Sequence, residues 1–240
     1  MRVRLLRWFF SSLIKLLSRS RVEGLENLPA RGPYILVSNH MSMADIPLGY
    51  TYIGGEHVAG WVAEKWRTNP LLWPILRMAR GIFIRRGEVD RGALEAAASW
   101  LRDGKIFALA PEGTRSRDGR LQRGKTGAAY LAQQADVPLV PVAVIGTERA
   151  FHSLFRLRRP ELTLRVGKPF RLPPPVPAER NSELRRHTDE IMCRIAALLP
   201  PQYRGEYAEH PRLAELLDHP DTSAARHPLD HSSASPPARL

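Results

Sequence analysis

The sequence predicts an α/β domain in which a central mixed sheet is flanked by helices. Short apolar segments rich in β-branched residues alternate with segments of helical spacing along most of the chain, and such alternation is typical of α/β folds. Hydrophobic residues make up 43% of the 240 residues, which is enough to bury one substantial core. We expect one domain over residues 21–200, preceded by an amphipathic helix over residues 1–20 and followed by a disordered tail over residues 201–240.

The segment of residues 1–20 predicts the amphipathic helix. Apolar side chains, Trp8 and Phe9 among them, are interspersed with basic ones such as Arg7 and Lys15. The favoured interpretation is a helix that lies at a membrane surface, where basic and aromatic side chains meet lipid headgroups. The alternatives are a helix packed on the domain and a spanning helix, although no stretch reaches the roughly 18 uninterrupted apolar residues that spanning requires. No small-residue cleavage pattern is present, so we do not expect a signal peptide.

The first half of the domain predicts strands separated by turns and helices. Residues 22–29 are rich in turn-forming residues and read as a connection. The strands of this half are expected at residues 34–38, 58–63 and 81–86. A helix is expected to begin near Asp45, because Pro47 is tolerated only in a first turn. Residues 66–79 predict a kinked or broken helix, since two prolines interrupt them.

The second half continues the same alternation. Strands are expected at residues 105–110, 138–145 and 162–166, and helices at residues 89–101 and 124–135. The strand at 138–145 is apolar and β-branched, which favours a central position despite Pro141. Residues 173–177 are mostly proline and predict a stiff linker. Asn181 or Ser182 is expected to cap the helix that follows.

Composition limits the classes of function. The formal net charge is +12, from 36 Lys and Arg against 24 Asp and Glu, which suits anionic lipid headgroups, phosphorylated substrates or nucleic acid. We expect no nucleic-acid partner, because no helix-turn-helix, zinc-finger or RNA-binding aromatic signature accompanies this charge. Cys193 is the single cysteine, so it forms no internal disulfide and is expected to be a packing residue. The chain beyond Pro200 is rich in Pro, His, Ser and Ala, which predicts a disordered tail with solvated histidines rather than a metal site.

The most informative stretch is residues 39–45, where His40 precedes Asp45 by five positions just after an expected strand. Residues five apart in one continuous helix point about 140° apart, so the pair can meet only if His40 lies in the turn and Asp45 at the helix start. The aspartate would then fix the tautomer of the imidazole, and the histidine would act as a general base on a bound hydroxyl. The alternative interpretations are an Asp45 that only caps the helix and a structural His40.

Three further blocks follow in order. Residues 81–86 form an apolar segment that ends in basic residues, residues 111–116 read PEGTRS, and residues 137–142 read VPLVPV. Together with the histidine–aspartate block, these segments resemble the four motifs of the glycerolipid acyltransferases, in particular the 1-acyl-glycerol-3-phosphate acyltransferases. The resemblance covers roughly residues 20–170, and it implies a single glycerolipid-acyltransferase-like domain.

The resemblance implies roles for named residues. His40 is then the general base and Asp45 its partner, and Arg86 is expected to contact the phosphate of the acceptor through its planar guanidinium. The other residues expected at the acceptor site are Glu112, Gly113, Thr114, Arg115 and, less securely matched, Lys125. The alternatives are an Arg86 solvated at a strand end and a Glu112 that pairs with Arg115. Arg85 departs from the family pattern, where a polar or acidic residue is common, and this leaves acceptor specificity open.

The implied reaction moves a fatty acyl group from an acyl thioester to the sn-2 hydroxyl of 1-acyl-glycerol-3-phosphate, which forms phosphatidic acid in phospholipid biosynthesis. The donor is acyl-coenzyme A or acyl-carrier protein, and no enzyme nucleophile, metal or redox cofactor is implied. The resemblance further implies a peripheral or monotopic protein on a membrane phospholipid surface at the cytoplasmic face. The alternatives are another lysophospholipid or an aminolipid as acceptor, and a non-catalytic peripheral protein that binds anionic lipid.

Overall fold

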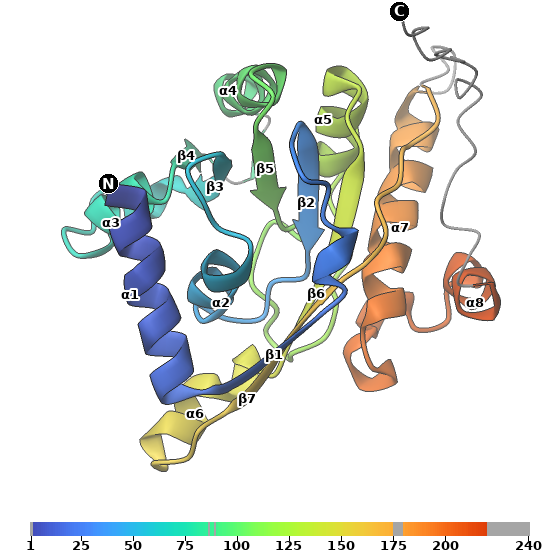
Figure 1. Cartoon of the computed structure of the whole chain (residues 1–240). Helices are drawn as coiled ribbons and strands as arrows, with labels where there is room; N and C mark the ends of the chain where they lie inside the picture. Colours follow the sequence, from blue (N-terminus) through green and yellow to red (C-terminus); the bar gives the residue numbers. More distant parts are fainter. Residues whose placement is uncertain (1, 86, 89, 175–179, 220–240) are drawn as a thin grey trace, which may run out of the picture.

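Strands of one mixed sheet form the centre of the molecule (Figure 1). The computed structural model describes residues 2–85, 87–88, 90–174 and 180–219. The strands are β1 (Arg19–Glu23), β2 (Tyr34–Ser38), β3 (Val58–Ala63), β4 (Gly81–Ile84), β5 (Ile106–Leu109), β6 (Leu139–Ile145) and β7 (Glu161–Val166). They lie in the order β1-β7-β6-β2-β5-β3-β4, and all neighbours are parallel except β6 and β7, which are antiparallel. The predicted mixed sheet is therefore confirmed.

Helices cover both faces of the sheet (Figure 1). The α-helices are α1 (Arg2–Leu17), α2 (Asp45–Tyr52), α3 (Leu72–Met78), α4 (Arg91–Arg102), α5 (Gly127–Ala135), α6 (Ala150–Phe155), α7 (Arg180–Leu198) and α8 (Pro211–Asp218). The short 3₁₀ helices are η1 (Leu25–Asn27), η2 (Glu64–Trp66), η3 (Thr147–Arg149), η5 (Pro201–Tyr203) and η6 (Gly205–Tyr207). One face of the sheet packs against α1 and α2, and the other packs against α4, α5 and α7.

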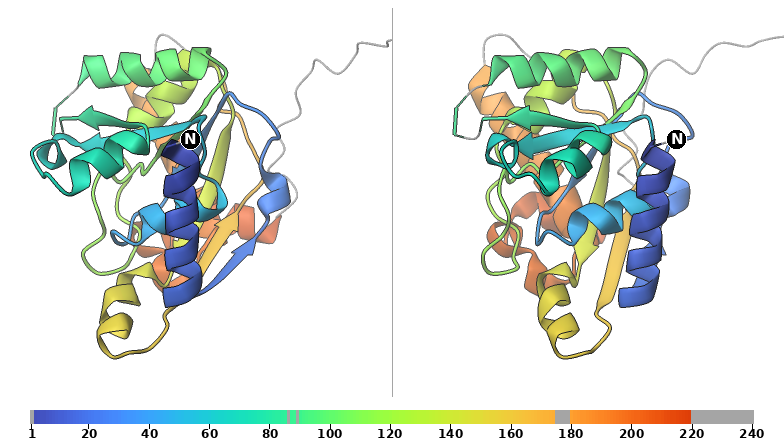
Figure 2. Two further views of the ribbon diagram at one scale, coloured as in Figure 1. Left: turned by 60° about the vertical axis from the view of Figure 1, so that its left-hand side comes forward. Right: turned by 90° about the vertical axis from the view of Figure 1, so that its left-hand side faces the viewer.

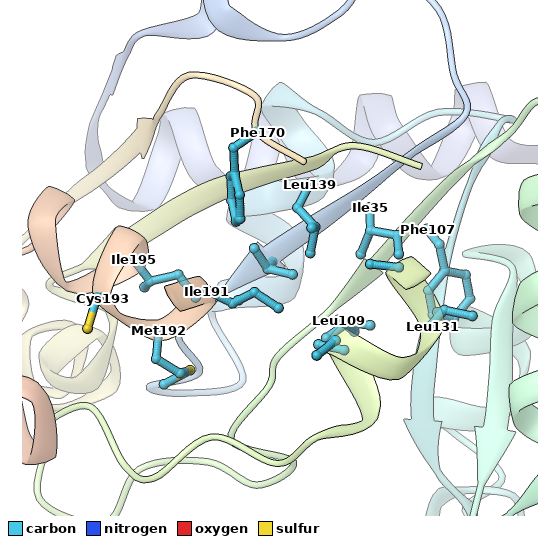
Figure 3. Close-up of a cluster of buried hydrophobic side chains, with 14 of the residues drawn as sticks. Ile35, Phe107, Leu109, Leu131, Leu139, Phe170, Ile191, Met192, Cys193 and Ile195 are labelled. Carbon is cyan, nitrogen blue, oxygen red and sulfur yellow. The ribbon is translucent and has the colours of Figure 1, made fainter. Parts of the chain in front are cut away.

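The central strand β2 is buried on both faces. Tyr34 and Leu36 belong to the hydrophobic cluster under α1 and α2, whereas Ile35 and Val37 belong to the larger cluster under α5 and α7. A strand of a parallel sheet that is covered on both sides reads as a continuous apolar run, which is why this segment was recognisable in the sequence. Figure 3 shows the larger cluster, including Cys193 on α7. Cys193 is fully buried, and burial raises the pKa of its thiol to about 12, as expected of a packing residue.

Other predicted elements are confirmed in place. β3 has the predicted bounds, and α2 begins at Asp45 with Pro47 in its first turn. The segment predicted to be a broken helix consists of η2 and α3, with Pro70 in the connection between them.

Strand β1 was not predicted. A helix was expected over residues 1–20 and a connection over residues 22–29, but α1 ends at Leu17 and Arg19–Glu23 pairs in parallel with β7. The reason is that β1 lies at the edge of the sheet and carries mostly polar side chains. Its pairing comes from backbone hydrogen bonds that leave no apolar run in the sequence.

Two predictions for the C-terminal part are wrong. Helix α7 already includes Asn181 and Ser182, so neither residue is its N-cap. The tail predicted over 201–240 folds as far as residue 218, where η5, η6 and α8 bury Tyr207, Leu213 and Leu216 against α7. These few apolar residues are spaced to face α7, and the surrounding polar composition hides them. Residues 175–177 of the predicted linker and residues 220–240 of the predicted tail lie outside the described residues.

Helix α1 presents two apolar faces. Val3, Leu6 and Phe10 are buried, and Phe10 packs edge-to-face on Tyr50 of α2. Another side of the helix exposes apolar side chains, namely Leu5, Trp8, Phe9 and Leu16, and Leu17 at the end of the helix is 37% exposed. None of the described helices is both long and apolar enough to cross a bilayer. The helix is therefore packed on the domain along one side and leaves a second apolar side uncovered by the described residues.

Candidate active site

The site lies where the parallel strands β2 and β5 end. Asn39 follows β2 and is almost fully buried. Its side-chain amide donates to the backbone oxygen of Val144 on β6 at 2.8 Å, and its oxygen accepts from the N–H of Val144 at 2.7 Å. This double hydrogen bond fixes the direction in which the chain leaves β2. His40, the next residue, therefore enters the site from a rigid base.

His40 and Asp45 meet, in the arrangement that the sequence analysis required. His40 lies in the turn after β2, Asp45 is the first residue of α2, and Nδ1 of His40 is 2.7 Å from Oδ2 of Asp45. Oδ2 also accepts from the backbone N–H groups of Met41 and Ser42, at 2.7 and 3.0 Å. Oδ1 accepts from the hydroxyl of Thr147 at 2.5 Å.

The carboxylate is thus held on both oxygens, and it orients the ring. With Asp45 as acceptor, the proton of a neutral His40 ring resides on Nδ1. Nε2 has no hydrogen-bond partner among the described residues, and His40 lines the large cavity described below. The side chain of His40 is 19% exposed and that of Asp45 is 9% exposed. Nε2, the ring nitrogen that can accept a proton, therefore belongs to a side chain that lines the cavity and that a ligand can reach.

Glu112 holds the backbone of His40. One carboxylate oxygen accepts the N–H of His40 and the other accepts the N–H of Gln122, each at 2.9 Å. Glu112 is 2% exposed, and burial raises its pKa to about 7 although both backbone hydrogen bonds lower it. The alternative of an ion pair with Arg115 is not the arrangement seen, because both oxygens are engaged by backbone groups.

Gly113 and Lys125 lie together at the wall of the cavity. Gly113 has φ 69°, and a Cβ there would come within 2.9 Å of Cδ and 3.1 Å of Nζ of Lys125. The backbone N–H of Lys125 donates to the oxygen of Pro111 at 2.7 Å, which holds the two segments together. Glycine is required here both for the left-handed backbone and for the close approach of the lysine.

Two of the remaining predicted residues do not line the large cavity. Thr114 and Arg115 line a second, smaller pocket of about 340 Å³ beside Phe151 of α6, not the large cavity. Arg86 lies outside the described residues. Arg85 lines the large cavity, but its guanidinium is 3.2 Å from a carboxylate oxygen of Glu88, so its charge is partly offset.

The large cavity has a volume of about 1410 Å³ and is mostly apolar along its walls. It reaches from His40 into the space between α2 and the sheet, where Leu36, Val142 and Ile46 line it. Gly60 and Ala108 also line it, side by side in the β3–β5 register. The volume of the cavity and its apolar walls fit a long apolar ligand with a polar end near His40.

Sequence reasoning missed several residues that build the site. Thr147 is fully buried in η3 and lies 102 positions from its partner Asp45. The signal available for it is its place after β6, at the same sheet edge as His40. Arg185 of α7 and Tyr207 of η6 hold the loop before Lys125, because they contact the backbone oxygen and N–H of Gly124 at 2.7 and 3.1 Å. No local pattern marks these two residues.

The model of the acyltransferase family matches residues 19–145. The chain belongs to the acyltransferase family. It is 36% identical over 141 residues to a chloroplastic 1-acyl-sn-glycerol-3-phosphate acyltransferase of Brassica napus. The alignment covers 54% of this chain and 38% of that protein. It is 34% identical over 170 residues to 1-acyl-sn-glycerol-3-phosphate acyltransferase alpha of Ovis aries, with 67% of this chain and 55% of that protein covered.

A solved structure is also similar. The crystal structure of the 1-acyl-sn-glycerophosphate acyltransferase from Thermotoga maritima matches with a TM-score of 0.60 and 29% identity, over 79% of this chain and 76% of that one. The resemblance inferred from the four sequence blocks is confirmed by these findings. The chain spans about half or less of the length of the two curated relatives.

Proposed function

We propose that this acyltransferase moves a fatty acyl group from an acyl thioester to the sn-2 hydroxyl of 1-acyl-glycerol-3-phosphate, which forms phosphatidic acid. The observation that carries the proposal is the His40–Asp45 pair, which lies at the polar end of a large apolar cavity. The acceptor is proposed from the similar proteins of Brassica napus and Ovis aries, both of which are 1-acyl-sn-glycerol-3-phosphate acyltransferases. The remaining steps follow from the geometry of the pair and from elementary chemistry.

In the proposed reaction, Nε2 of His40 accepts the proton of the acceptor hydroxyl as its oxygen attacks the thioester carbonyl. The resulting imidazolium is stabilised by Asp45, whose carboxylate is already aligned with Nδ1. Collapse of the tetrahedral intermediate breaks the C–S bond, and His40 returns the proton to the departing thiolate. Charge and atoms balance without an enzyme nucleophile, a metal or a redox cofactor.

The phosphate of the acceptor is assigned to the basic residues near His40. Lys125 lies over Gly113 at the cavity wall, where an ammonium group would offset the charge of the phosphate. Arg86 and Arg115 remain proposed contacts, with Arg115 reaching the acceptor from the smaller pocket. The acyl chain is assigned to the apolar part of the cavity under α2, and the donor thioester is acyl-coenzyme A or acyl-carrier protein.

Membrane association is part of the proposal, since acceptor and product are lipids. The uncovered side of α1 carries Trp8, Phe9 and Leu16 next to basic residues of the same helix. Such a surface suits a helix that lies in the headgroup region of an anionic bilayer. A chain docked by α1 would be a peripheral or monotopic protein, with its acceptor delivered from the membrane.

The decisive experiment incubates the purified chain with a labelled acyl thioester and 1-acyl-glycerol-3-phosphate, with other lysophospholipids and an aminolipid in parallel. We expect labelled phosphatidic acid from the native chain and none from His40→Ala, whereas His57→Ala, which changes an exposed histidine that does not line the cavity, remains active. Transfer to another acceptor alone would contradict the proposed substrate. Lipid binding without transfer to any acceptor, unchanged in His40→Ala, would favour a non-catalytic lipid-binding protein.

A further inference from the structure

The connection between β6 and β7 exposes two large apolar side chains at its tip. Phe155 ends α6 and is 88% exposed, and Leu157 in the following loop is 96% exposed. No other large hydrophobic side chain in the described part of the chain is as exposed as these two. Large apolar side chains that project this far into solvent indicate a contact with a protein partner or a membrane.

A defined C-terminal turn of α6 holds Leu157 in its exposed position. The N–H of Leu157 donates to the oxygen of Leu154, and the N–H of Arg158 donates to the oxygen of Ser153, both at 2.9 Å. This is the Schellman arrangement, whose left-handed position is usually occupied by glycine. Leu157 takes that position with φ 54°, so a leucine stands where glycine would be the less strained choice. The side chain of Leu157 is almost unburied by the described residues, so packing within them does not offset the strain.

The charges around the tip are basic. Arg156, Arg158 and Arg159 flank Leu157 and are all exposed. Guanidinium groups next to exposed phenylalanine and leucine suit the boundary between anionic headgroups and acyl chains, where the charges remain at the headgroups while the apolar side chains enter deeper. Among partners that could cover the tip, the charge therefore favours an anionic lipid surface.

The tip is joined to α1. The guanidinium of Arg159 donates to the backbone oxygens of Lys15 and Ser18, at 2.5 and 2.7 Å, beside the end of α1. The N–H of Arg19 donates to the oxygen of Pro160 at 2.8 Å. All three views place α6 next to the C-terminal end of α1 (Figures 1 and 2). The loop that follows α6 is therefore attached by hydrogen bonds to the C-terminal end of α1.

The same connection reaches the candidate active site. Helix η3 directly precedes α6 and contains Thr147, which donates to Asp45. Phe151 of α6 lines the smaller pocket together with Thr114 and Arg115. A bilayer in contact with α6 would thus lie next to the pocket that Phe151, Thr114 and Arg115 line.

We propose that residues 150–159 form a second membrane contact, in which Phe155 and Leu157 insert into an anionic bilayer while Arg156 and Arg158 bind lipid headgroups. This inference deepens the proposed function and rests on it for the reason why a bilayer should lie at this edge. Together with α1, the contact fixes the orientation of the site relative to the membrane. One helix alone would leave the domain free to rotate about the axis of that helix.

The first test measures binding to vesicles of phosphatidylcholine and phosphatidylglycerol in equal parts, by sedimentation. Leu157→Gly is the informative variant, because glycine preserves the turn and relieves its strain while removing the apolar side chain. We expect about tenfold weaker binding for Leu157→Gly and about fivefold weaker binding for Arg158→Gln. Leu217→Gln, which changes a part-exposed leucine of α8, is the control and is expected to bind as the native chain does.

The second test reports insertion directly. An environment-sensitive thiol label on Leu157→Cys should shift its emission to the blue with these vesicles, whereas the same label on Leu217→Cys should not. The native Cys193 is fully buried and will escape labelling in the folded chain. Unchanged vesicle binding by Leu157→Gly, or an unshifted label, would overturn the proposal. So would self-association of the native chain that Leu157→Gly abolishes while vesicle binding persists.

These outcomes are independent of catalysis. Vesicle binding requires no turnover, so failure of acyl transfer would not by itself remove the membrane contact. With detergent-dispersed acceptor, Leu157→Gly is expected to transfer acyl groups at the native rate, because the change lies outside both cavities. Loss of acyl transfer by Leu157→Gly in detergent would show that residues 150–159 act on the active site itself. That result would contradict a role confined to the bilayer.

Discussion

Replacement of Glu112 by glutamine should remove a specific part of the pH dependence of stability. Burial raises the pKa of Glu112 from 4.5 to about 7 in the folded chain. Between these two values the folded state retains a proton that the unfolded state has released. The free energy of unfolding must therefore fall as the pH rises through this interval, and the contribution is constant above and below it.

The magnitude follows from the two pKa values. Each pH unit over which the two states differ by one proton changes the free energy of unfolding by about 1.4 kcal/mol. The interval from 4.5 to about 7 thus corresponds to a loss of about 3 kcal/mol. Glutamine does not titrate, so Glu112→Gln lacks this slope. It carries instead a pH-independent cost of about 1–3 kcal/mol, because its amide group faces one of the two backbone N–H donors.

The assay is urea unfolding of the native chain and the variant at about pH 5 and about pH 8. The stability advantage of the native chain over Glu112→Gln should shrink by about 2–3 kcal/mol from the lower to the higher pH. Glu209→Gln, at an exposed position, serves as the control and should show no such change. An advantage of Glu112 that is equal at both pH values would refute the reasoning, since Glu112 would then titrate as in an unfolded chain.

Three further substitutions test how the site is built. Thr147→Val keeps the shape but leaves the buried carboxylate of Asp45 without one donor, so kcat should fall about tenfold and stability by about 1–3 kcal/mol, measured by steady-state kinetics and urea unfolding. Gly113→Ala places a Cβ against Lys125 at a left-handed position, and KM for the acceptor should rise about tenfold with KM for the donor unchanged. Tyr207→Phe removes the acceptor of a backbone N–H in the loop before Lys125 and should lower kcat/KM for the acceptor about fivefold. Native kinetics in any of these variants would exclude the contact from the working site.

The parts of the fold that the sequence predicted are those whose residues face apolar surroundings. β2 was visible because both of its faces are buried, and the break before α3 was visible because proline cannot continue a helix. β1 was missed because its pairing with β7 depends on backbone groups of a polar edge strand. The helix α8 was missed because Leu213 and Leu216 are buried only by packing against α7, which is distant in the local sequence pattern.

The same division applies to the candidate site. His40 and Asp45 are five positions apart, and a local argument about turns and helix starts was enough to bring them together. Thr147 and Tyr207 could not be found in this way, because each reaches the site from an element that the sheet or α7 places there. Local spacing identifies the proposed reacting pair, while the groups that hold it come from the tertiary fold.

These holding groups explain how a residue in a turn can be positioned for the proposed role of general base. The N–H of His40 is bound by Glu112, its backbone oxygen accepts the N–H of Ser116 at 2.7 Å, and its Nδ1 is bound by Asp45. The two backbone hydrogen bonds fix the main chain at His40, and rotation of the imidazole would break its hydrogen bond to Asp45, whose carboxylate is itself held by other groups. Little reorganisation is then needed when the acceptor hydroxyl arrives, and the position of Nε2 is fixed before the substrate binds.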